Sequence, residues 1–350
     1  MSDEEHATKL GGFEKYLVIW IPLCMLAGGL LSQFTHAGDS IEAFSIRGIS
    51  VPIGICLFFM MYPAVLNLKG SELKKLKQTP TPILLTVFSN WIIAPLVGFG
   101  LAKIFLADHD QLFVAVILLS ASPCTAMVLV WGAMANGNQE QNVVNTSLNT
   151  LTIMLFYGPL VALLTGIQNI EIDRWGLAVS VIIFIGLPIL IGLLTRKIVI
   201  PRKGNDWFEE VYRPFFGKVS MVALLITLIV LFALNGATLL GNPEYLLLVS
   251  VPLLLSFVIV VGFNLWITKL FRLHYREAVI TVIIGSSSHF EIAIATAIAT
   301  YGVGSVAALG TTMGLFWEIP IMLFLVYFAK HLARKKFWPP LKGVENEKVN

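Results

Sequence analysis

The sequence predicts an all-α polytopic membrane protein, and three observations support this fold class. Of its 350 residues, 57% are hydrophobic and only 13% are charged, whereas soluble globular proteins carry roughly 25% charged residues. The mean hydropathy is +0.82, and ten apolar segments come close to the about 20 residues that span a bilayer. Lysine and arginine also alternate from loop to loop, as a ten-span topology requires.

The ten predicted spans follow one another through short connections, so residues 1–350 form a single integral membrane unit without an inserted soluble domain. The longest connection is polar and runs from Lys197 to Arg213. The N-terminal MSDEEHATKL lacks the basic region of a cleaved signal peptide, so the first span is expected to remain in the protein. The spans cover residues 15–34, 48–67, 82–106, 112–135, 143–166, 176–198, 214–236, 245–268, 277–301 and 304–330.

The distribution of positive charge orients these spans. When the N-terminus is placed inside, 3 of the 24 Lys and Arg residues fall outside (Arg47, Lys103 and Arg174), which leaves 21 inside. Because cytoplasmic loops are enriched in Lys and Arg, we expect a multi-pass protein of the cytoplasmic membrane with both termini in the cytoplasm. Topology explains the basic loops, so membrane lipid is expected around the chain and nucleic acid is not. The oligomeric state is left open.

Ten spans divide into two sets of five, and a second set built like the first would be inverted in the membrane. The first repeat would cover about 15–166 and the second about 176–330. Inverted repeats are typical of secondary transporters, which bind substrate near the bilayer midplane at broken helices. The prediction is that helices four and nine are both interrupted.

Both helices carry an interruption signal at membrane depth. Helix four reads LFVAVILLSASPCTAMVLVWG, with Pro123 near its middle, and proline breaks or kinks a helix. Helix nine contains the small and polar run GSSSHFE at residues 285–291, centred on Ser287 and Ser288. Backbone groups freed in hydrocarbon cost several kcal/mol each, so such breaks occur mainly where protein buries them or where they line a cavity.

Three side chains near these breaks carry chemistry. Cys124 follows Pro123 directly and is either an inert small hydrophobe or a soft ligand. Glu318 lies in helix ten and Glu291 beside the second break. A charged residue at the helix centre costs roughly 2.5–3.5 kcal/mol on insertion scales, and such residues are functional candidates by default. The alternative is that each carboxylate pairs with a buried donor.

Helix five adds a polar stripe, and two further polar residues lie within the spans. The stripe consists of Asn142, Asn145 and Asn149, with Thr146 and Thr150 adjacent, on one helical face. It would serve either ion and substrate binding or interhelical hydrogen bonding. Asn90 and His289 are weaker candidates of the same kind. The sequence has no GxSxG, HExxH or Walker motif and no CxxC pair, so neither an enzyme nor a cofactor is expected.

Several motifs, in order along nearly the whole chain, resemble one known family. They are EKYLVIWIPLCMLAGG (14–29), PIGICLFFMMYPAVL (52–66), SNWIIAP (89–95), SPCTAMVLVWG (122–132), HFEIAIATAI (289–298) and WEIPIMLFLV (317–326). The chain resembles the arsenical-resistance arsenite permease family of the bile acid:sodium symporter superfamily. The resemblance implies ten helices, with a core of helices three to five and eight to ten, where broken helices four and nine cross, and a panel of helices one, two, six and seven.

The resemblance also implies roles for particular residues. The family's essential membrane cysteine falls on Cys124, its helix-ten glutamate on Glu318 and its helix-nine FE pair on Phe290–Glu291. The chain departs from the family pattern at three positions. Many members carry arginine where this chain has Pro123, asparagine where it has Gly132, and asparagine where it has His289.

Together these observations predict a secondary active transporter that exports arsenite, with antimonite as a further substrate, in exchange for protons. A thiolate prefers such soft trivalent centres. One water-accessible hollow would join the sulfur and the acids. The expected substrate-binding residues are Cys124, Glu318, Asn90, Asn149 and His289; the expected ion-coupling residues are Glu318, Glu291, Asn145, Thr146 and Ser287; and Pro123 and Ser287 mark the breaks.

Two alternatives remain open at this point. A sodium-coupled symporter of an organic anion, such as a bile acid or a small carboxylate, shares the fold. Its sodium cage would draw on Glu291, Ser287, Asn145 and Thr146. A passive channel or receptor is less favoured, because buried glutamates suit no simple pore and the short loops offer little signalling surface.

Overall fold

The computed structural model describes residues 17–34, 45–46, 49–66, 80–125, 127–170, 172–241, 243–302 and 304–339. It confirms the predicted class, because this part of the chain is almost entirely helical and has 6 helices long and apolar enough to cross a membrane. Four shorter apolar helices accompany them: Ile19–Phe34, Gly54–Pro63, Asp110–Ser120 and Phe290–Tyr301. One small departure is an antiparallel pair of two-residue strands, β1 (Ser45–Ile46) and β2 (Ile49–Ser50).

Each of the ten predicted spans falls on a helix or on consecutive helical pieces. The first half contains α2 (Leu17–Phe34), α4 (Val51–Leu66), α5 (Pro80–Phe88), the π-helical turn η2 (Ser89–Ile93), α6 (Ala94–Phe105), α7 (Asp110–Ser120), α8 (Met127–Met134) and α9 (Gln139–Ile167). The second half contains α10 (Arg174–Val181), η3 (Ile182–Gly186), α11 (Leu187–Lys203), α12 (Asn205–Trp207), η4 (Phe208–Tyr212), α13 (Arg213–Gly241), α14 (Pro243–Leu270), α15 (Tyr275–Gly285), α16 (Phe290–Tyr301) and α17 (Val306–Arg334). The inverted repeat and its boundaries stay a prediction.

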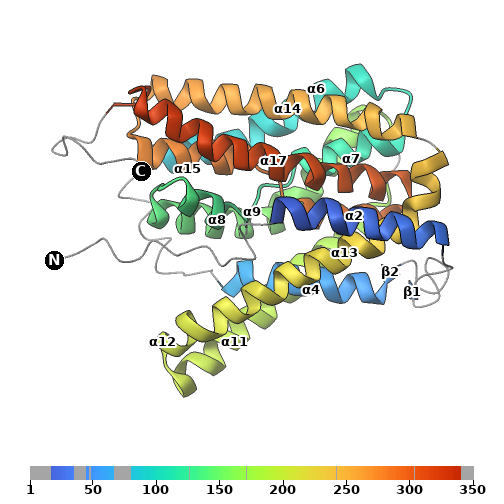
Figure 1. Cartoon of the computed structure of the whole chain (residues 1–350), viewed down its shortest axis with the longest axis horizontal. Coiled ribbons are helices and arrows are strands. Elements are labelled where there is room, and N and C mark those ends of the chain that lie inside the picture. The colour runs from blue at the N-terminus through green and yellow to red at the C-terminus, as the bar shows by residue number, and fades with distance from the viewer. Residues whose placement is uncertain are drawn as a thin grey trace.

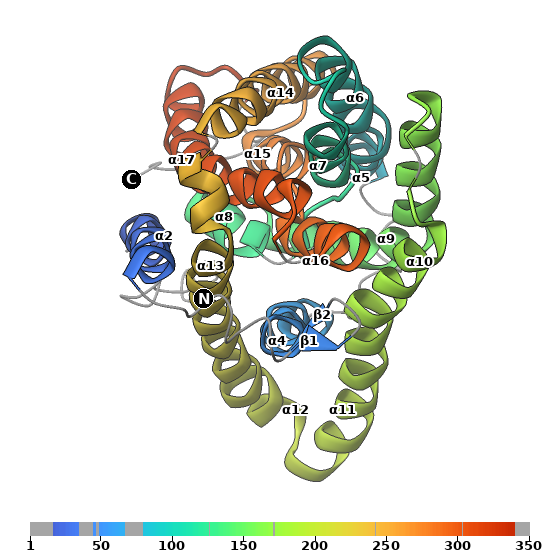
Figure 2. The same cartoon turned by 90° about the vertical axis from the view of Figure 1, so that its right-hand side faces the viewer.

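The helices form three layers when viewed along their length (Figure 2). On one side, α13 packs against α2 and α4, and α4 packs against α11. On the opposite side lie α6, α7, α14 and α15, with α8, α9, α16 and α17 between the two (Figures 1 and 2). This grouping agrees with the predicted panel and core, which remain predictions as functional domains.

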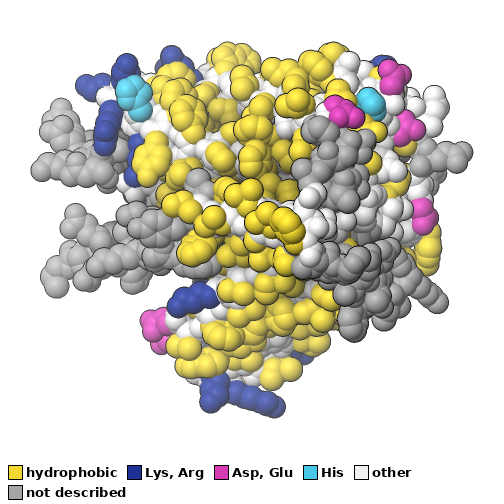
Figure 3. All heavy atoms as spheres, turned by 45° about the vertical axis from the view of Figure 1, so that its right-hand side comes forward, with side chains coloured by type: hydrophobic (Ala, Val, Ile, Leu, Met, Phe, Trp, Pro, Cys, Tyr) yellow, Lys and Arg dark blue, Asp and Glu magenta, His cyan; other side chains and the backbone are white. Residues whose placement is uncertain are grey.

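The surface is arranged as a membrane protein requires. Hydrophobic side chains cover the middle of the face in Figure 3, whereas Lys and Arg gather mainly at one end and at the tip near α11 and α12. Large apolar side chains that a soluble protein would bury are exposed on these helices, including Leu84, Leu155 and Leu247. Exposed apolar surface of this extent marks a membrane-facing protein.

The polar connection predicted between Lys197 and Arg213 is largely helical, because both neighbouring helices continue into it. Helix α11 runs to Lys203 and α12 begins at Asn205. Gly204 makes the turn between them with φ of +87°, a conformation that glycine adopts without steric cost. Polar composition therefore marks the end of the membrane-spanning part and not the end of the helix.

Both predicted interruptions are present in the fold. Helix α7 ends at Ser120 and α8 begins at Met127, and α15 ends at Gly285 and α16 begins at Phe290. Three π-helical turns in other helices each come just before a proline: η2 before Pro95, η3 before Pro188 and η4 before Pro214. In η2 the Ala94 N–H bonds to Ser89 O, five residues back, just before Pro95, which has no N–H to donate.

Candidate functional site

The two helix breaks bond to each other and thereby satisfy their own backbone groups. Pro123 and Ser288 form an antiparallel bridge. The His289 N–H donates to Ser122 O at 2.6 Å, and the Cys124 N–H donates to Ser287 O at 3.4 Å. Because unpaired backbone groups at membrane depth are costly, this pairing explains how two interrupted helices persist within an apolar bundle.

Glu318 reaches the second break from α17. Its Oε1 accepts from the Ser287 hydroxyl at 2.5 Å and from the Ser288 N–H at 3.1 Å, and its Oε2 accepts from the Ser288 hydroxyl at 2.5 Å. The side chain is only 2% exposed. An ionised carboxylate only accepts hydrogen bonds, so three donors compensate for its removal from water. A carboxylate that took up a proton would have to rearrange these bonds.

His289 and Glu291 form a second buried polar unit that joins the two breaks. His289 Nδ1 lies 2.7 Å from Glu291 Oε2, and His289 Nε2 lies 2.8 Å from Thr125 Oγ1. A carboxylate favours the tautomer with a proton on Nδ1, which leaves Nε2 to accept from the Thr125 hydroxyl when the imidazole is neutral. Glu291 also lies in the first turn of α16, where the helix dipole favours negative charge.

Two further elements hold the first break: α9, which is the predicted helix five, and the π-helical turn η2. Asn149 Nδ2 donates to Cys124 O at 3.0 Å, and Asn149 Oδ1 accepts from Asn90 Nδ2 at 3.3 Å. Asn90 lies within η2, and its neighbour Ser89 donates to Gly285 O at 2.9 Å. The structure therefore brings Asn90 and Asn149 to the breaks as hydrogen-bond partners of the protein itself, and their substrate-binding role stays a prediction.

The described hydrogen bonds of Asn145 and Thr146 do not reach the breaks, and their ion-coupling role stays a prediction. Asn145 Nδ2 donates to Thr86 Oγ1 at 3.4 Å, and the Thr146 hydroxyl donates to Val143 O in its own helix. Asn145 Oδ1 has no hydrogen-bond partner in the described structure. Of the helix-five stripe, only Asn149 contacts a break through a described hydrogen bond.

Cys124 is buried within the apolar core at the first break. Its exposed fraction is 1%, and it belongs to the main hydrophobic cluster of the protein. Pro123 sets the local extended conformation, and Ser287 and Asn149 fix the backbone of Cys124 through its N–H and C=O groups. The backbone of Cys124 is therefore held next to the segment that carries the Glu318 contacts.

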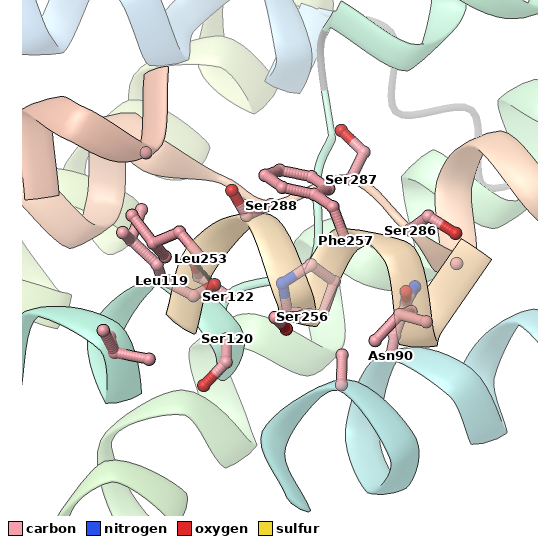
Figure 4. Close-up of a pocket in the computed structure, with 16 residues that line it drawn as sticks. Asn90, Leu119, Ser120, Ser122, Leu253, Ser256, Phe257, Ser286, Ser287 and Ser288 are labelled. Carbon is pink, nitrogen blue, oxygen red and sulfur yellow. Dashed lines mark hydrogen bonds between the residues drawn. The ribbon is translucent and has the colours of Figure 1, made fainter. Parts of the chain in front are cut away.

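A cavity of about 50 Å³ lies beside the breaks, between α6, α7 and α14 (Figure 4). Of the sequence-predicted residues, Asn90, Pro123 and Ser287 line it. Cys124, His289, Glu291 and Glu318 do not, so this cavity is not the single hollow expected to join the sulfur and the acids. Its other polar lining residues are Ser120, Ser122, Ser256, Ser286 and Ser288.

Sequence reasoning assigned no role to three residues that the geometry makes prominent. Ser288 donates twice to Glu318, Thr125 contacts the His289 ring, and Asn264 Nδ2 donates to Ser89 Oγ and Ser286 Oγ at 2.8 and 3.1 Å. The signal for Asn264 was present, since it is an isolated amide within an apolar span. Ser288 and Thr125 lie next to the predicted site residues Ser287 and Cys124, and nothing in the sequence indicates which member of each pair makes the contact.

Broken helices that meet inside an apolar bundle, with carboxylates buried beside them, define the class of multi-pass membrane transporters. The chain belongs to the sodium bile acid symporter family, whose pattern matches residues 54–242. This finding confirms the family resemblance inferred from the motifs and makes a transporter the function class of the protein.

Three relatives extend this similarity over nearly the full chain. The chain is 36% identical to an uncharacterized transporter of Synechocystis sp., over 95% of this chain and 93% of the relative. It is 32% identical to the arsenical-resistance protein Acr3 of Alkaliphilus metalliredigens, over 96% and 97% of the two chains. It is 29% identical to the protein of the same name from Corynebacterium glutamicum, over 94% and 92%.

Proposed function

We propose that this protein is a secondary active transporter that exports arsenite, with antimonite as a further substrate, across the cytoplasmic membrane in exchange for protons. Two relatives of nearly equal length bear the name of arsenical-resistance proteins. Cys124 is the proposed ligand of the metalloid and Glu318 the proposed proton-exchanging group, with Glu291 beside it.

One observation carries this proposal: Ser287 is bonded both to Cys124 and to Glu318. Its carbonyl accepts from the Cys124 N–H and its hydroxyl donates to Glu318 Oε1. A proton that arrives on Glu318 changes how its two oxygens share the bonds that Ser287 and Ser288 donate, so the donors rearrange together. Because Ser287 also fixes the backbone at Cys124, the protonation of Glu318 and the placement of the sulfur are mechanically linked.

The chemistry of the ligands suits release as well as binding. Arsenite near neutral pH is an uncharged trihydroxide, and a thiolate binds its soft centre by displacing hydroxide. A carrier must let go of what it binds, and a single sulfur holds the metalloid less tightly than three would. We expect the layer of α2, α4, α11 and α13 to move against the remaining helices during transport.

The direct test is arsenite export from cells or everted vesicles that contain single variants. Cys124→Ser removes the soft ligand and should abolish export, whereas Cys24→Ser and Cys56→Ser, which change the two other cysteines, should leave it intact. Glu318→Gln should abolish the response to a proton gradient. Wild-type export by a well-expressed Cys124→Ser protein would remove the sulfur from the mechanism.

A sodium-coupled symporter of an organic anion is the second candidate, because the family carries that name. The unpartnered Asn145 Oδ1 is an oxygen of the kind that sodium prefers. Sodium-stimulated uptake of a labelled carboxylate, with no effect of arsenite, would favour this function over arsenite export.

A further inference from the structure

The cavity in Figure 4 is polar enough to hold water. Six serines and Asn90 line it, and none of its lining side chains is charged. Its volume is about 50 Å³. A buried water needs about 10–15 Å³ of such space and two to four polar partners, so by volume the cavity accommodates about three to five water molecules.

Two of the lining hydroxyls also contact Glu318. Ser287 and Ser288 face the cavity and donate to Glu318 Oε1 and Oε2, each at 2.5 Å. Glu318 itself is buried and lies outside the cavity wall. The side chains of Ser120 and Ser122 bond instead to carbonyls of their own helix. Among the described lining residues, Ser287 and Ser288 therefore form the connection between the cavity and the carboxylate.

We propose that this cavity is a hydrated compartment from which protons reach Glu318 through the Ser288 and Ser287 hydroxyls, apart from the Cys124 side of the breaks. The inference rests on the function proposed above, since it supplies the proton path for the coupling carboxylate. The Ser288 hydroxyl transfers its proton to Glu318 Oε2, and Ser288 Oγ takes a replacement proton from a hydronium ion that forms when an excess proton from the aqueous side reaches the cavity water, so that water is left neutral. Release reverses both transfers, so neither serine is changed overall.

None of the other ionisable groups in the described part of the chain lines the cavity. Glu291 on α16 is bonded to His289 outside the cavity. The other helices packed against α17 carry their described charges near their ends. These are Asp110 on α7, Glu244 and Lys269 on α14, Arg276 and Glu277 on α15, and Arg213 and Lys218 on α13.

The wall that presents the two serines is held in place by Asn264 on α14. Asn264 Nδ2 donates to Ser286 Oγ and to Ser89 Oγ, and the Ser89 hydroxyl donates to Gly285 O. A Cβ at Gly285 would come within 2.8 Å of Asn264 Oδ1, so glycine is required for this close approach. The serines next to Gly285 are thus positioned before any proton arrives.

Infrared spectroscopy of the protein in lipid bilayers tests the path without arsenite. The protonated carboxyl band of Glu318 is identified by its loss in Glu318→Gln, and its rate of hydrogen–deuterium exchange is then measured. The Ser287→Ala/Ser288→Ala double variant should exchange at least about tenfold more slowly. Ser120→Ala removes a hydroxyl from the same cavity without touching Glu318 and should exchange like the wild type, and Ser288→Thr, which keeps a hydroxyl, should too.

Three results would overturn the proposal. They are an unchanged exchange rate in the double variant, an equal slowing in Ser120→Ala, and the lack of a Glu318 carboxyl band at any pH that the protein tolerates. In vesicles, the double variant should lose proton flux driven by arsenite but keep arsenite-for-arsenite exchange, and loss of both would assign the serines a structural role instead. A wild-type protein that moves no arsenite would reject the proposed function, while the infrared exchange rate would still decide the proton path.

Discussion

At the scale of single residues, His289 contacts Thr125 of the first break through Nε2 and Glu291, two residues along its own segment, through Nδ1. An His289→Asn variant keeps the backbone bond to Ser122 but cannot span from Glu291 to Thr125, so one buried polar group loses its partner. Such a loss costs about 1–3 kcal/mol, and we expect a lower unfolding temperature in detergent. The same substitution at the exposed His331 is the matched control. Equal unfolding temperatures for His289→Asn and the wild type would show that the bridge adds no stability.

The roles of such residues could be predicted from the sequence only where the signal is local. Pro123 breaks its own helix, and Glu318 stands out because an acid in an apolar span is rare. That Ser288 and not Ser286 donates to Glu318 depends on how α17 packs against the break, 30 residues away along the chain. The orientation of Asn145 toward Thr86 likewise depends on the position of α5.

At the scale of helices, Gly132 allows α8 to pack closely against α9 and α15. A Cβ at this position would lie 2.3 Å from Asn142 Nδ2 and 2.6 Å from Ile280 Cδ1. Gly132→Ala therefore has to displace the Asn142 amide from its bond to Val128 O, and we expect a loss of about 1–3 kcal/mol. Gly100→Ala in α6 meets no atom within 4 Å and should be neutral or stabilising. Thermal unfolding of both variants, measured in the same detergent, tests this difference.

The sixth predicted span consists of α10, η3 and α11. Its π-helical turn η3 is a candidate hinge for motion between the layers seen in Figure 2. At η3 the Leu187 N–H bonds to Ile182 O, five residues back, directly before the buried Pro188. The segment before this turn packs against α9 and α16, and the segment after it packs against α4. A π-helical turn at a proline is a point where a helix bends.

We therefore expect Pro188→Ala to slow arsenite transport several-fold without weakening arsenite binding. The new N–H restores a regular helical bond across η3, which stiffens the bend. Protection of Cys124 from a small thiol reagent by arsenite measures binding, and vesicle flux measures turnover. Pro201→Ala, near the exposed end of α11, is the control. An unchanged flux in Pro188→Ala would exclude η3 as a hinge.

The elements themselves were largely predictable, because each span and each break has its signal within about 20 residues. The helical continuation between Lys197 and Arg213 was not, since polar residues form helices as readily outside the membrane as apolar residues do inside it. The cavity was not predictable either. Its lining combines residues of α6, α7, α14 and both breaks, and no local pattern records how these elements meet.

At the scale of the whole molecule, the charge pattern predicts which end faces the cytoplasm. The turn between α6 and α7 lies at the opposite end of the bundle from the end of α17 (Figure 1). The turn between α6 and α7, with the start of α7, carries Asp108 and Asp110. The C-terminal end of α17 and the residues after it carry Arg334, Lys335 and Lys336. Positive charge favours the cytoplasmic side, so the end of α17 should lie inside the cell.

Cysteine labelling of intact cells tests this orientation. In a Cys24→Ser/Cys56→Ser background, Asp108→Cys should react with a membrane-impermeant maleimide added outside. Lys335→Cys should react only after the membrane is opened, since both positions are exposed but lie at opposite ends. The Cys24→Ser/Cys56→Ser protein without a further substitution provides the labelling baseline. Labelling of Lys335→Cys in intact cells would show that the protein has the opposite orientation. The direction in which a proton gradient drives the proposed export would then be opposite as well.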